Sequence, residues 1–284
     1  MIVSQGNDPD GGRLLAWEEL LENSEAMGPL TRRAVVLVAA LVMGACSRSA
    51  APVSERAPAF NPDAAAVDAS STSTSTSTST STDPPGSYMG RVIAAPMSYR
   101  GADWLDRTER ETTQKPEYVL DALAIREGQT VADVGCGSGY FTTRIAKRVG
   151  PRGRVLATDL QPEMLELLKK KLAAQSITNV VPVLATPDDA KLPRGEVDLV
   201  LMVDVYHELP KPPVTLAQIK TALAPKGRLA LVEYKAEDPK VQIKPEHKTT
   251  LVQLRRELEA NGFVFVSTDE SLPEQRLVIF EPSR

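Results

Sequence analysis

Two spacings of hydrophobic residues alternate along the chain from residue 116 to its end. Short apolar runs, typical of buried strands, are separated by segments whose apolar residues recur every three or four positions, as in amphipathic helices. One such helix carries Phe141, Ile145 and Val149, and another opens at Pro162. The predicted strands cover residues 130–134, 154–158, 180–184, 197–203 and 228–232.

The segment 197–203 is apolar at nearly every position, which is expected of a central parallel strand covered on both faces. After a helical stripe in residues 251–258, the segments 263–266 and 276–280 predict two strands with a short connection, and therefore a hairpin. The whole pattern predicts an α/β fold: a doubly wound, Rossmann-like, seven-stranded, mostly parallel sheet with an antiparallel C-terminal hairpin. In such sheets a ligand binds at the carboxyl ends of the strands.

The first 87 residues do not carry this pattern. Residues 1–26 are acidic and do not resemble the start of a signal peptide, so we expect them to be disordered or translation to begin at Met27. Residues 27–46 combine a basic start, a short apolar run and small residues before Cys46, which are the parts of a secretory signal peptide. Residues 47–87 are rich in Ser, Thr, Pro and Ala and predict a disordered tether.

Cys46 directly follows Gly44 and Ala45, and this arrangement resembles the lipobox of bacterial lipoproteins. The resemblance implies a lipid anchor on Cys46 in the cell envelope, facing the periplasm or the exterior, as the protein's only membrane contact. The alternative is a cytoplasmic protein in which Cys46 is incidental. In a bacterial host, palmitate should label the wild type and not Cys46→Ala; label retained in the variant would contradict the anchor.

Charge and cysteine content exclude two classes of protein. The formal net charge of -4 provides no basic surface for a phosphate backbone, so nucleic acid is not an expected partner. Two cysteines cannot build a disulfide framework, and Cys136, inside a glycine-rich loop, is expected to be a small buried side chain. Nothing in the composition indicates an oligomeric state.

The candidate chemistry begins directly after the first predicted strand. Gly135, Gly137 and Gly139 are three positions without a Cβ at which the backbone can approach a ligand closely. Asp159, at the tip of the next strand, can accept hydrogen bonds from both hydroxyls of a ribose. Together they predict a nucleoside-cofactor site. The fingerprint of nicotinamide dehydrogenases, G-x-G-x-x-G, would require glycine where Tyr140 stands.

Residues 133–139, DVGCGSG, resemble the first motif of class I S-adenosylmethionine-dependent methyltransferases. Residues 158–165, TDLQPEML, and 187–193, PDDAKLP, resemble the second and third motifs of that family. Residues 197–208 and 223–229 complete the series, which covers nearly everything from residue 131 to residue 280. The resemblance implies S-adenosyl-L-methionine as the cofactor and methyl transfer as the activity of a domain spanning residues 116–284.

The resemblance also implies a role for each matching residue. Asp159 should hold the ribose hydroxyls, Leu160 should pack near the adenine, and Asp188, or failing that Asp189, should receive the adenine amino group. The implied cofactor-binding residues are Asp133, Gly135, Gly137, Gly139, Asp159, Leu160, Asp188, Asp189 and Asp204.

The chain has only two histidines, His207 and His247. The family places acceptor-facing residues after the fourth strand, where Tyr206 and His207 stand. An imidazole can remove a proton at neutral pH, so His207 is a candidate general base or acceptor-orienting group, with Tyr206 beside it. The alternative is a histidine that only hydrogen-bonds its loop or caps the next helix. Two histidines without a cysteine partner predict no metal site.

Residues 88–115 precede the methyltransferase-like segment, and their part 97–107 mixes aromatic and charged residues. This part could fold over the cofactor as a lid that supplies Tyr99 and Trp104, or pack as an N-terminal cap. The Asn/Asp-Pro-Pro-Tyr signature of many amino-methylating enzymes is absent after the fourth strand, so we expect a small-molecule or envelope acceptor. The alternatives are a non-catalytic S-adenosylmethionine-binding sensor and, with less support, an NAD-dependent dehydrogenase.

Overall fold

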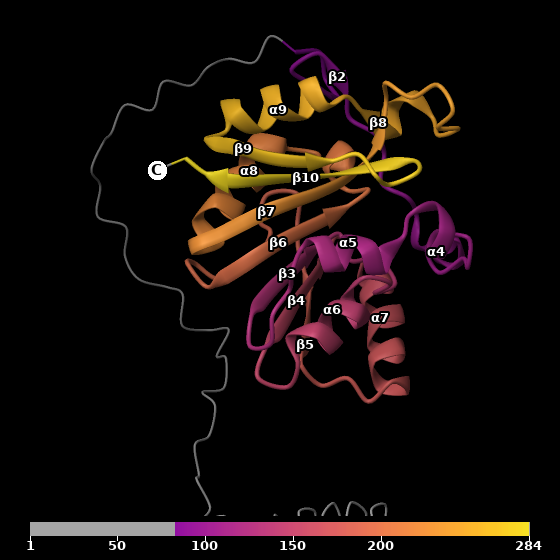
Figure 1. The fold of residues 1–284 in the computed structure, drawn as a ribbon, viewed down its shortest axis with the longest axis vertical. Coiled ribbons are helices and arrows are strands. Elements are labelled where there is room, and N and C mark those ends of the chain that lie inside the picture. The colour runs from indigo at the N-terminus through magenta and orange to yellow at the C-terminus, as the bar shows by residue number, and fades with distance from the viewer. Residues whose placement is uncertain (1–82, 284) are drawn as a thin grey trace, which may run out of the picture. The chain divides into compact units, whose positions relative to one another are not determined.

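A mixed β-sheet forms the centre of the computed structural model, which describes residues 83–283 (Figure 1). The strands follow one another across the sheet in the order β5-β4-β3-β6-β7-β10-β9, and a short strand, β8, pairs with β7. Their bounds are β3 Thr130–Val134, β4 Arg154–Asp159, β5 Val180–Leu184, β6 Val197–Val203, β7 Leu223–Lys235, β8 Lys248–Thr249, β9 Phe263–Asp269 and β10 Gln275–Pro282.

The order of the strands creates the crevice that the sequence predicted. The chain enters at β3, moves outward through β4 and β5, and returns to add β6 and β7 on the other side of β3. All of these neighbours pair in parallel, with Asp133 of β3 opposite Ala157 and Leu201. Because the connections leave β3 and β6 in opposite directions, a crevice opens at their carboxyl ends.

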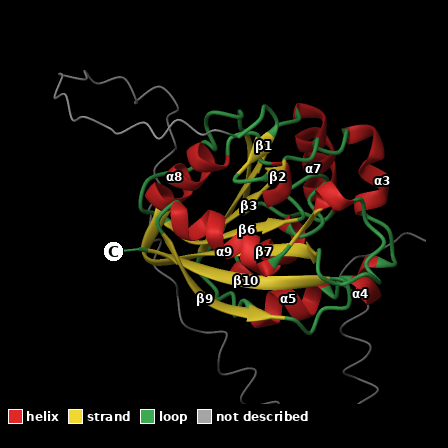
Figure 2. Ribbon diagram, turned by 90° about the horizontal axis from the view of Figure 1, so that it is seen from above, coloured by secondary structure: helices red, strands yellow, loops and turns green. Residues whose placement is uncertain are grey.

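The helices cover both faces of this sheet (Figure 2). Side chains alternate along β6, so that Val200 and Met202 lie in a core shared with α8 and α9, while Leu199 and Leu201 lie in a core shared with α5 and α6. The helices are α3 Ala102–Leu105, α4 Arg110–Thr113, α5 Pro116–Ala122, α6 Thr142–Val149, α7 Pro162–Ala174, α8 Pro212–Ala222 and α9 Leu251–Ala260. Short 3-10 turns are η2 Tyr99–Gly101, η3 Tyr206–Glu208 and η4 Pro245–His247.

The predicted elements match the observed ones closely, with two differences. The sheet has eight strands rather than seven, because the two residues of β8 pair with Tyr234 and Lys235. The strand predicted over residues 228–232 is longer in the structure and begins at Leu223, which pairs with Val197 before the register shifts. The antiparallel end of the sheet is confirmed, since β10 pairs antiparallel with both β7 and β9.

An N-terminal hairpin precedes this domain. It consists of β1 (Ser87–Tyr88) and β2 (Arg91–Val92), so it includes Ser87, which the sequence had assigned to the tether. The predicted signal peptide, Cys46 and the remainder of the tether lie outside the described residues. Within residues 83–283, the helices are too short or too polar to cross a lipid bilayer.

Candidate functional site

A cavity of about 750 Å³ lies at the carboxyl ends of β3, β4, β6 and β7. Its size falls in the range of sites for small molecules and cofactors, roughly 300–1,000 Å³. Much of the lining comes from three regions: the loop after β3 with the end of β4, the two 3-10 turns η3 and η4, and the segment that precedes α5. Lining residues from these regions include Gly135, Gly137, Asp159, Leu160, His207, Glu208, His247, Met97, Trp104, Leu105 and Arg110.

The loop after β3 needs glycine for conformation and for space. Gly135 has φ +72°, and a Cβ there would lie 2.5 Å from Cγ2 of Val205. Gly137 lines the cavity with its backbone, and a Cβ there would lie 2.7 Å from Cδ1 of Leu105. Gly139 packs on α7 through Leu168 and does not line the cavity. The structure therefore places two of the three predicted glycines at the cavity.

Asp159 ends β4 and points into this loop. Its Oδ2 accepts a hydrogen bond from the backbone N–H of Gly137, and its Oδ1 accepts one from that of Gln161, both at 2.9 Å. Burial raises the pKa of Asp159, and the backbone donors oppose that rise. An ionised carboxylate has about four lone-pair sites, so Asp159 can also accept the hydroxyls of a ribose. Leu160, the next residue, lines the cavity as predicted.

Asp133 lies beneath the loop instead of in the cavity wall. Its Oδ2 accepts a hydrogen bond from the Thr142 hydroxyl at 2.5 Å, which ties β3 to the first residue of α6. Burial raises the pKa of Asp133 to about 6. From this position Asp133 supports the loop, and its side chain does not line the cavity, in contrast to the predicted contact with the cofactor.

The two aspartates expected to receive the adenine amino group face away from the cavity. Asp188 forms an ion pair with Lys211, and Asp189 forms one with Lys191. Both carboxylates are solvent-exposed, and neither lines the cavity, although Pro187 and Ala190 on either side of them do. The motif therefore reaches the cavity through its apolar residues.

His207 and His247 meet at another part of the wall. The Nε2 atom of His207 lies 3.0 Å from Nδ1 of His247, and Oε1 of Glu208 lies 3.8 Å and 3.7 Å from these two nitrogens. Nδ1 of His207 lies 2.6 Å from Oε2 of Glu233, which is fully buried on β7. His207, Glu208 and His247 line the cavity, and Glu233 lies behind His207. The fold thus gathers four polar side chains from η3, η4 and β7.

Tyr206 is placed differently from its neighbour. Its hydroxyl donates to Oε2 of Glu257 at 2.7 Å, and its side chain is fully buried and does not line the cavity. The structure thus assigns Tyr206 to the packing between η3 and α9. Only His207 of the two predicted acceptor-side residues lies at the cavity.

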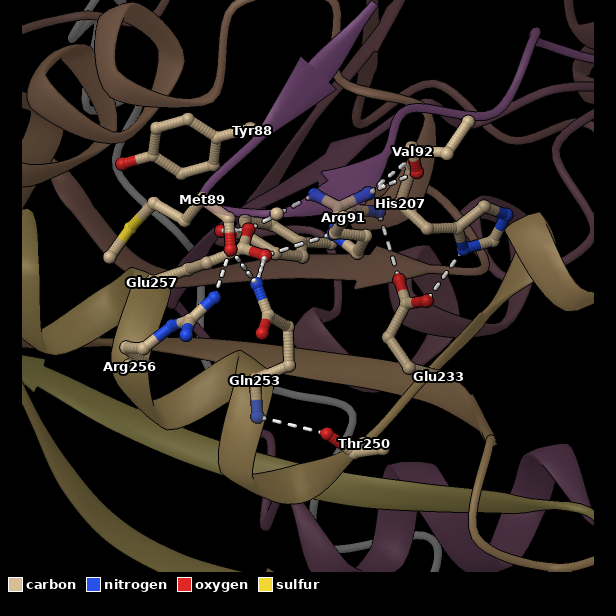
Figure 3. A network of polar contacts seen from close by, with 12 residues as sticks. Tyr88, Met89, Arg91, Val92, His207, Glu233, Thr250, Gln253, Arg256 and Glu257 are labelled. Atoms are coloured by element: carbon tan, nitrogen blue, oxygen red, sulfur yellow. Dashed lines mark hydrogen bonds and ion pairs between the residues drawn. The ribbon is translucent and has the colours of Figure 1, made fainter. Parts of the chain in front are cut away.

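Figure 3 shows how the N-terminal hairpin holds this region in place. Arg91 donates from Nε and Nη2 to both carboxylate oxygens of Glu257 on α9, at 2.9 and 3.0 Å. Its Nη1 donates to the backbone carbonyl of His207 at 3.0 Å. Gln253 donates to the same Glu257. Arg91 therefore ties three distant segments together directly behind the cavity wall.

Comparison with known proteins identifies the domain. Residues 132–229 match a family model described as "Methyltransferase domain". A crystal structure of a SAM dependent methyltransferase from Aquifex aeolicus superposes with a TM-score of 0.62 at 28% identity, covering 65% of this chain and 98% of that one. The central part of the chain, residues 132–229, is thus similar to a methyltransferase domain, and the fold is similar to that of a SAM dependent methyltransferase. S-adenosylmethionine is accordingly its cofactor, and the dehydrogenase alternative is set aside.

Two other relatives are similar over shorter stretches. A protein-L-isoaspartate O-methyltransferase from Aeropyrum pernix is 32% identical over 154 residues, which is 50% of this chain and 55% of that protein. A ubiquinone/menaquinone biosynthesis C-methyltransferase from Psychromonas ingrahamii is 30% identical over 118 residues, 41% of this chain and 47% of that protein. The chain thus spans about half the length of these relatives.

The residues around the cavity of the methyltransferase domain fit this cofactor. The buried carboxylate of Asp159 suits ribose hydroxyls, and Leu160, Met164 and Ala190 offer an apolar wall for a nucleobase. Nucleobases and sulfonium groups both favour such a mixed site with few, well-placed polar groups.

The segment before α5 contributes a buried cation that sequence reasoning missed. Arg110 lines the cavity, lies 4.1 Å above the Tyr140 ring, and donates from Nη1 to the Leu105 carbonyl. Burial lowers the pKa of Arg110, and Asp204 opposes this, but an arginine remains charged in proteins. No local pattern distinguishes Arg110 from the other arginines of its segment, because its burial comes from distant contacts.

The same segment provides part of the predicted lid. Trp104 and Leu105 line the cavity, whereas Tyr99 does not: its backbone N–H donates to Oε1 of Gln161 at 2.9 Å. The side-chain amide of Gln161 donates in return to the Met97 carbonyl at 2.8 Å. These bonds fasten η2 to the start of α7, next to Asp159.

Asp204 lines the cavity in a left-handed backbone conformation, φ +56°. Burial and the neighbouring Glu233 raise the pKa of Asp204 to about 7, against the opposing effects of Arg110, His207 and the Gln275 amide. The folded protein therefore holds a proton on Asp204 that the unfolded chain, with an ordinary pKa of 3.8, releases. Stability must then fall as the pH rises from about 4 to about 7.

Asp204→Asn is expected to remove this part of the pH dependence. Asparagine tolerates the left-handed backbone and keeps an acceptor for Gln275, but it has no proton to lose. Urea unfolding should give similar free energies of unfolding for the two proteins near pH 4. At pH 8 the free energy of unfolding of the variant should be higher by about 2–4 kcal/mol. Parallel pH profiles for the two proteins would contradict the assignment.

Proposed function

We propose that this protein transfers the methyl group of S-adenosylmethionine to a small-molecule or envelope acceptor. The observation that carries the proposal is the continuity of the cavity: one space is lined by the ribose-type acceptor Asp159 and by the polar groups of η3 and η4. A cofactor seated against Asp159 and an acceptor seated against His207 would share this space. The names of the relatives include both O- and C-methyl transfer, so they leave the acceptor class open.

The bound cofactor supplies an electrophilic methyl group on a sulfonium. What the chain must contribute is alignment and the exclusion of water. The loop glycines and Asp159 hold one partner, while Trp104, Leu105 and the bonds of Gln161 close the cavity beside it. Arg110 places a buried positive charge where it can face a carboxylate of a ligand.

His207 is suited to orienting the acceptor. Burial lowers the pKa of His207, but Glu233, Asp204 and Glu208 together raise it above its ordinary value, so the ring keeps its second proton to a higher pH than a free imidazole does. A protonated imidazole donates hydrogen bonds and cannot take up another proton. We therefore propose that His207, held by Glu233, positions the acceptor, and that it serves as a base only after losing its own proton.

The function is tested with the full chain. Calorimetry should show binding of S-adenosylmethionine and no heat with NAD, and labelled cofactor should lose its methyl group to a member of a panel of phenol, thiol, amine and quinone-type acceptors. Absence of S-adenosylmethionine binding would overturn the proposal. Binding without transfer to any acceptor and without slow hydrolysis would instead identify a non-catalytic S-adenosylmethionine sensor.

A further inference from the structure

We propose that His207, His247 and Glu208 bind a divalent transition-metal ion in the cavity. The proposal goes beyond methyl transfer, because the site is defined by its own ligands and can be tested with the metal alone. These three residues offer two imidazole nitrogens and one carboxylate oxygen that all lie within 4.8 Å of one another. Two histidines and one carboxylate form the ligand set of many catalytic zinc and non-haem iron sites.

The spacing of the three atoms suits an ion. His207 Nε2, His247 Nδ1 and Glu208 Oε1 form a triangle with sides of 3.0, 3.7 and 3.8 Å. The point in the plane of this triangle that is equidistant from its corners lies about 2.0 Å from each atom, which matches zinc–nitrogen and zinc–oxygen bonds of about 2.0–2.2 Å. The three atoms therefore already lie at bonding distance from one common point, and the imidazole rings have only to turn their lone pairs toward it.

The tautomer of His207 is set by its partner on β7. Glu233, when ionised, can only accept hydrogen bonds, so the hydrogen of the imidazole lies on Nδ1, 2.6 Å from Glu233 Oε2. Metal binding requires the neutral ring, so Nε2 must give up its hydrogen when the ion enters, and its lone pair is then free for the ion. A carboxylate behind a metal-binding histidine is a common arrangement, since it fixes the ring and strengthens the ligand. Glu233 is itself held by the backbone N–H of Tyr206, at 2.9 Å.

Local charge and access also favour a cation. Two carboxyl groups adjoin His207: Oε2 of Glu233 lies 2.6 Å from Nδ1, and Oε1 of Glu208 lies 3.8 Å from Nε2. The His207 and His247 rings meet nearly at right angles, 80°, with centroids 5.0 Å apart. All three ligands line the cavity, so an ion can enter from it and keep its remaining coordination positions open toward it. A ligand of the methyltransferase domain would meet the ion there.

The sequence alone had predicted no metal site, because two histidines without a cysteine partner do not form a recognisable metal-binding motif. The ligands come from η3 and η4, and the two histidines are separated by 40 positions in the chain. Only the turn that returns from β7 to β8 brings His247 to the end of β6.

The test uses the full chain without a polyhistidine tag, in a Cys46→Ser background that removes a competing thiol. Zinc titrated calorimetrically should bind at about one ion per chain, and cobalt should give a visible d–d absorption band. His247→Ala and Glu208→Gln should each weaken zinc binding by at least about 100-fold, more than the roughly 10–100-fold loss typical of residues that only support a ligand. Glu246→Gln, which alters a nearby carboxylate in the cavity wall, is the matched control and should keep the wild-type affinity.

A spectroscopic measurement makes the result specific. Because the chain has two histidines, ¹⁵N-histidine labelling reports only these two rings. Zinc should shift Nε2 of His207 and Nδ1 of His247, and Glu233→Gln should change the His207 tautomer pattern and weaken zinc binding about 10–100-fold. Zinc binding that His247→Ala leaves intact, or zinc that shifts neither ring, would overturn the proposal. Neither result depends on whether the domain binds S-adenosylmethionine, so failure here leaves the proposed function standing.

Discussion

Asp159→Ala is expected to weaken binding of S-adenosylmethionine by at least about 100-fold. A buried carboxylate that accepts hydrogen bonds from two ribose hydroxyls contributes about 1.5–3 kcal/mol for each, and every 1.4 kcal/mol is a factor of ten. The variant also leaves the N–H groups of Gly137 and Gln161 without their acceptor, so the loop loses its anchor. Calorimetry on the full chain measures the loss.

Asp188→Ala is the matched control for this experiment. Asp188 belongs to the segment expected to contact the adenine, yet its carboxylate is exposed and paired with Lys211. We expect near wild-type affinity for this variant. An equal loss in both variants would show that Asp188 reaches the adenine when cofactor binds, and unchanged affinity in Asp159→Ala would contradict the placement of the ribose.

Arg91→Met is expected to cost about 3–5 kcal/mol of unfolding free energy, because it leaves Glu257 as a buried charge without its partner. The side chains of this pair are 7% and 0% exposed. Glu257 would retain Tyr206 and Gln253 as donors, but neither carries a positive charge. Urea unfolding of the full chain gives the magnitude.

Two further variants separate the charge from the packing of the Arg91 side chain. Adding Glu257→Gln to Arg91→Met should recover part of the lost stability, since the amide can still accept from Tyr206 without carrying a charge. Arg152→Met breaks the exposed pair with Glu127 and should change stability by less than about 1 kcal/mol. If Arg91→Met and Arg152→Met lowered the free energy of unfolding equally, burial of the Arg91–Glu257 pair would not contribute to stability.

Positions that depend on short-range pattern were predicted well. The strands β3, β5 and β6 have the predicted bounds, because a run of apolar residues bounded by turn residues is read within a few positions. The C-terminal hairpin followed from the same logic. Asp159, Gly135 and Gly137 do line the cavity, because strand, turn and acid stand in a fixed order along the chain; Gly139 does not.

Predictions that depended on the direction of a side chain succeeded less often. Asp133, Asp188 and Tyr206 all belong to segments that border the cavity, but their side chains point to Thr142, Lys211 and Glu257. A motif fixes the path of the backbone more firmly than the partner that each polar side chain finds. Arg110 was missed for the related reason that its burial is invisible in its own segment.

The sequence by itself determined the α/β alternation, the glycine loop, the acid at the tip of the second strand and, through the resemblance, the cofactor. These features are local, since each needs only neighbouring residues. The tertiary structure alone decided the rest: the contact of His207 with Glu233 and His247, 26 and 40 positions away, and of Arg91 with Glu257, 166 positions away. Such contacts form only when the sheet has placed β6, β7 and α9 side by side, because the attraction between charged or polar groups acts over ångströms of space and is independent of distance along the chain.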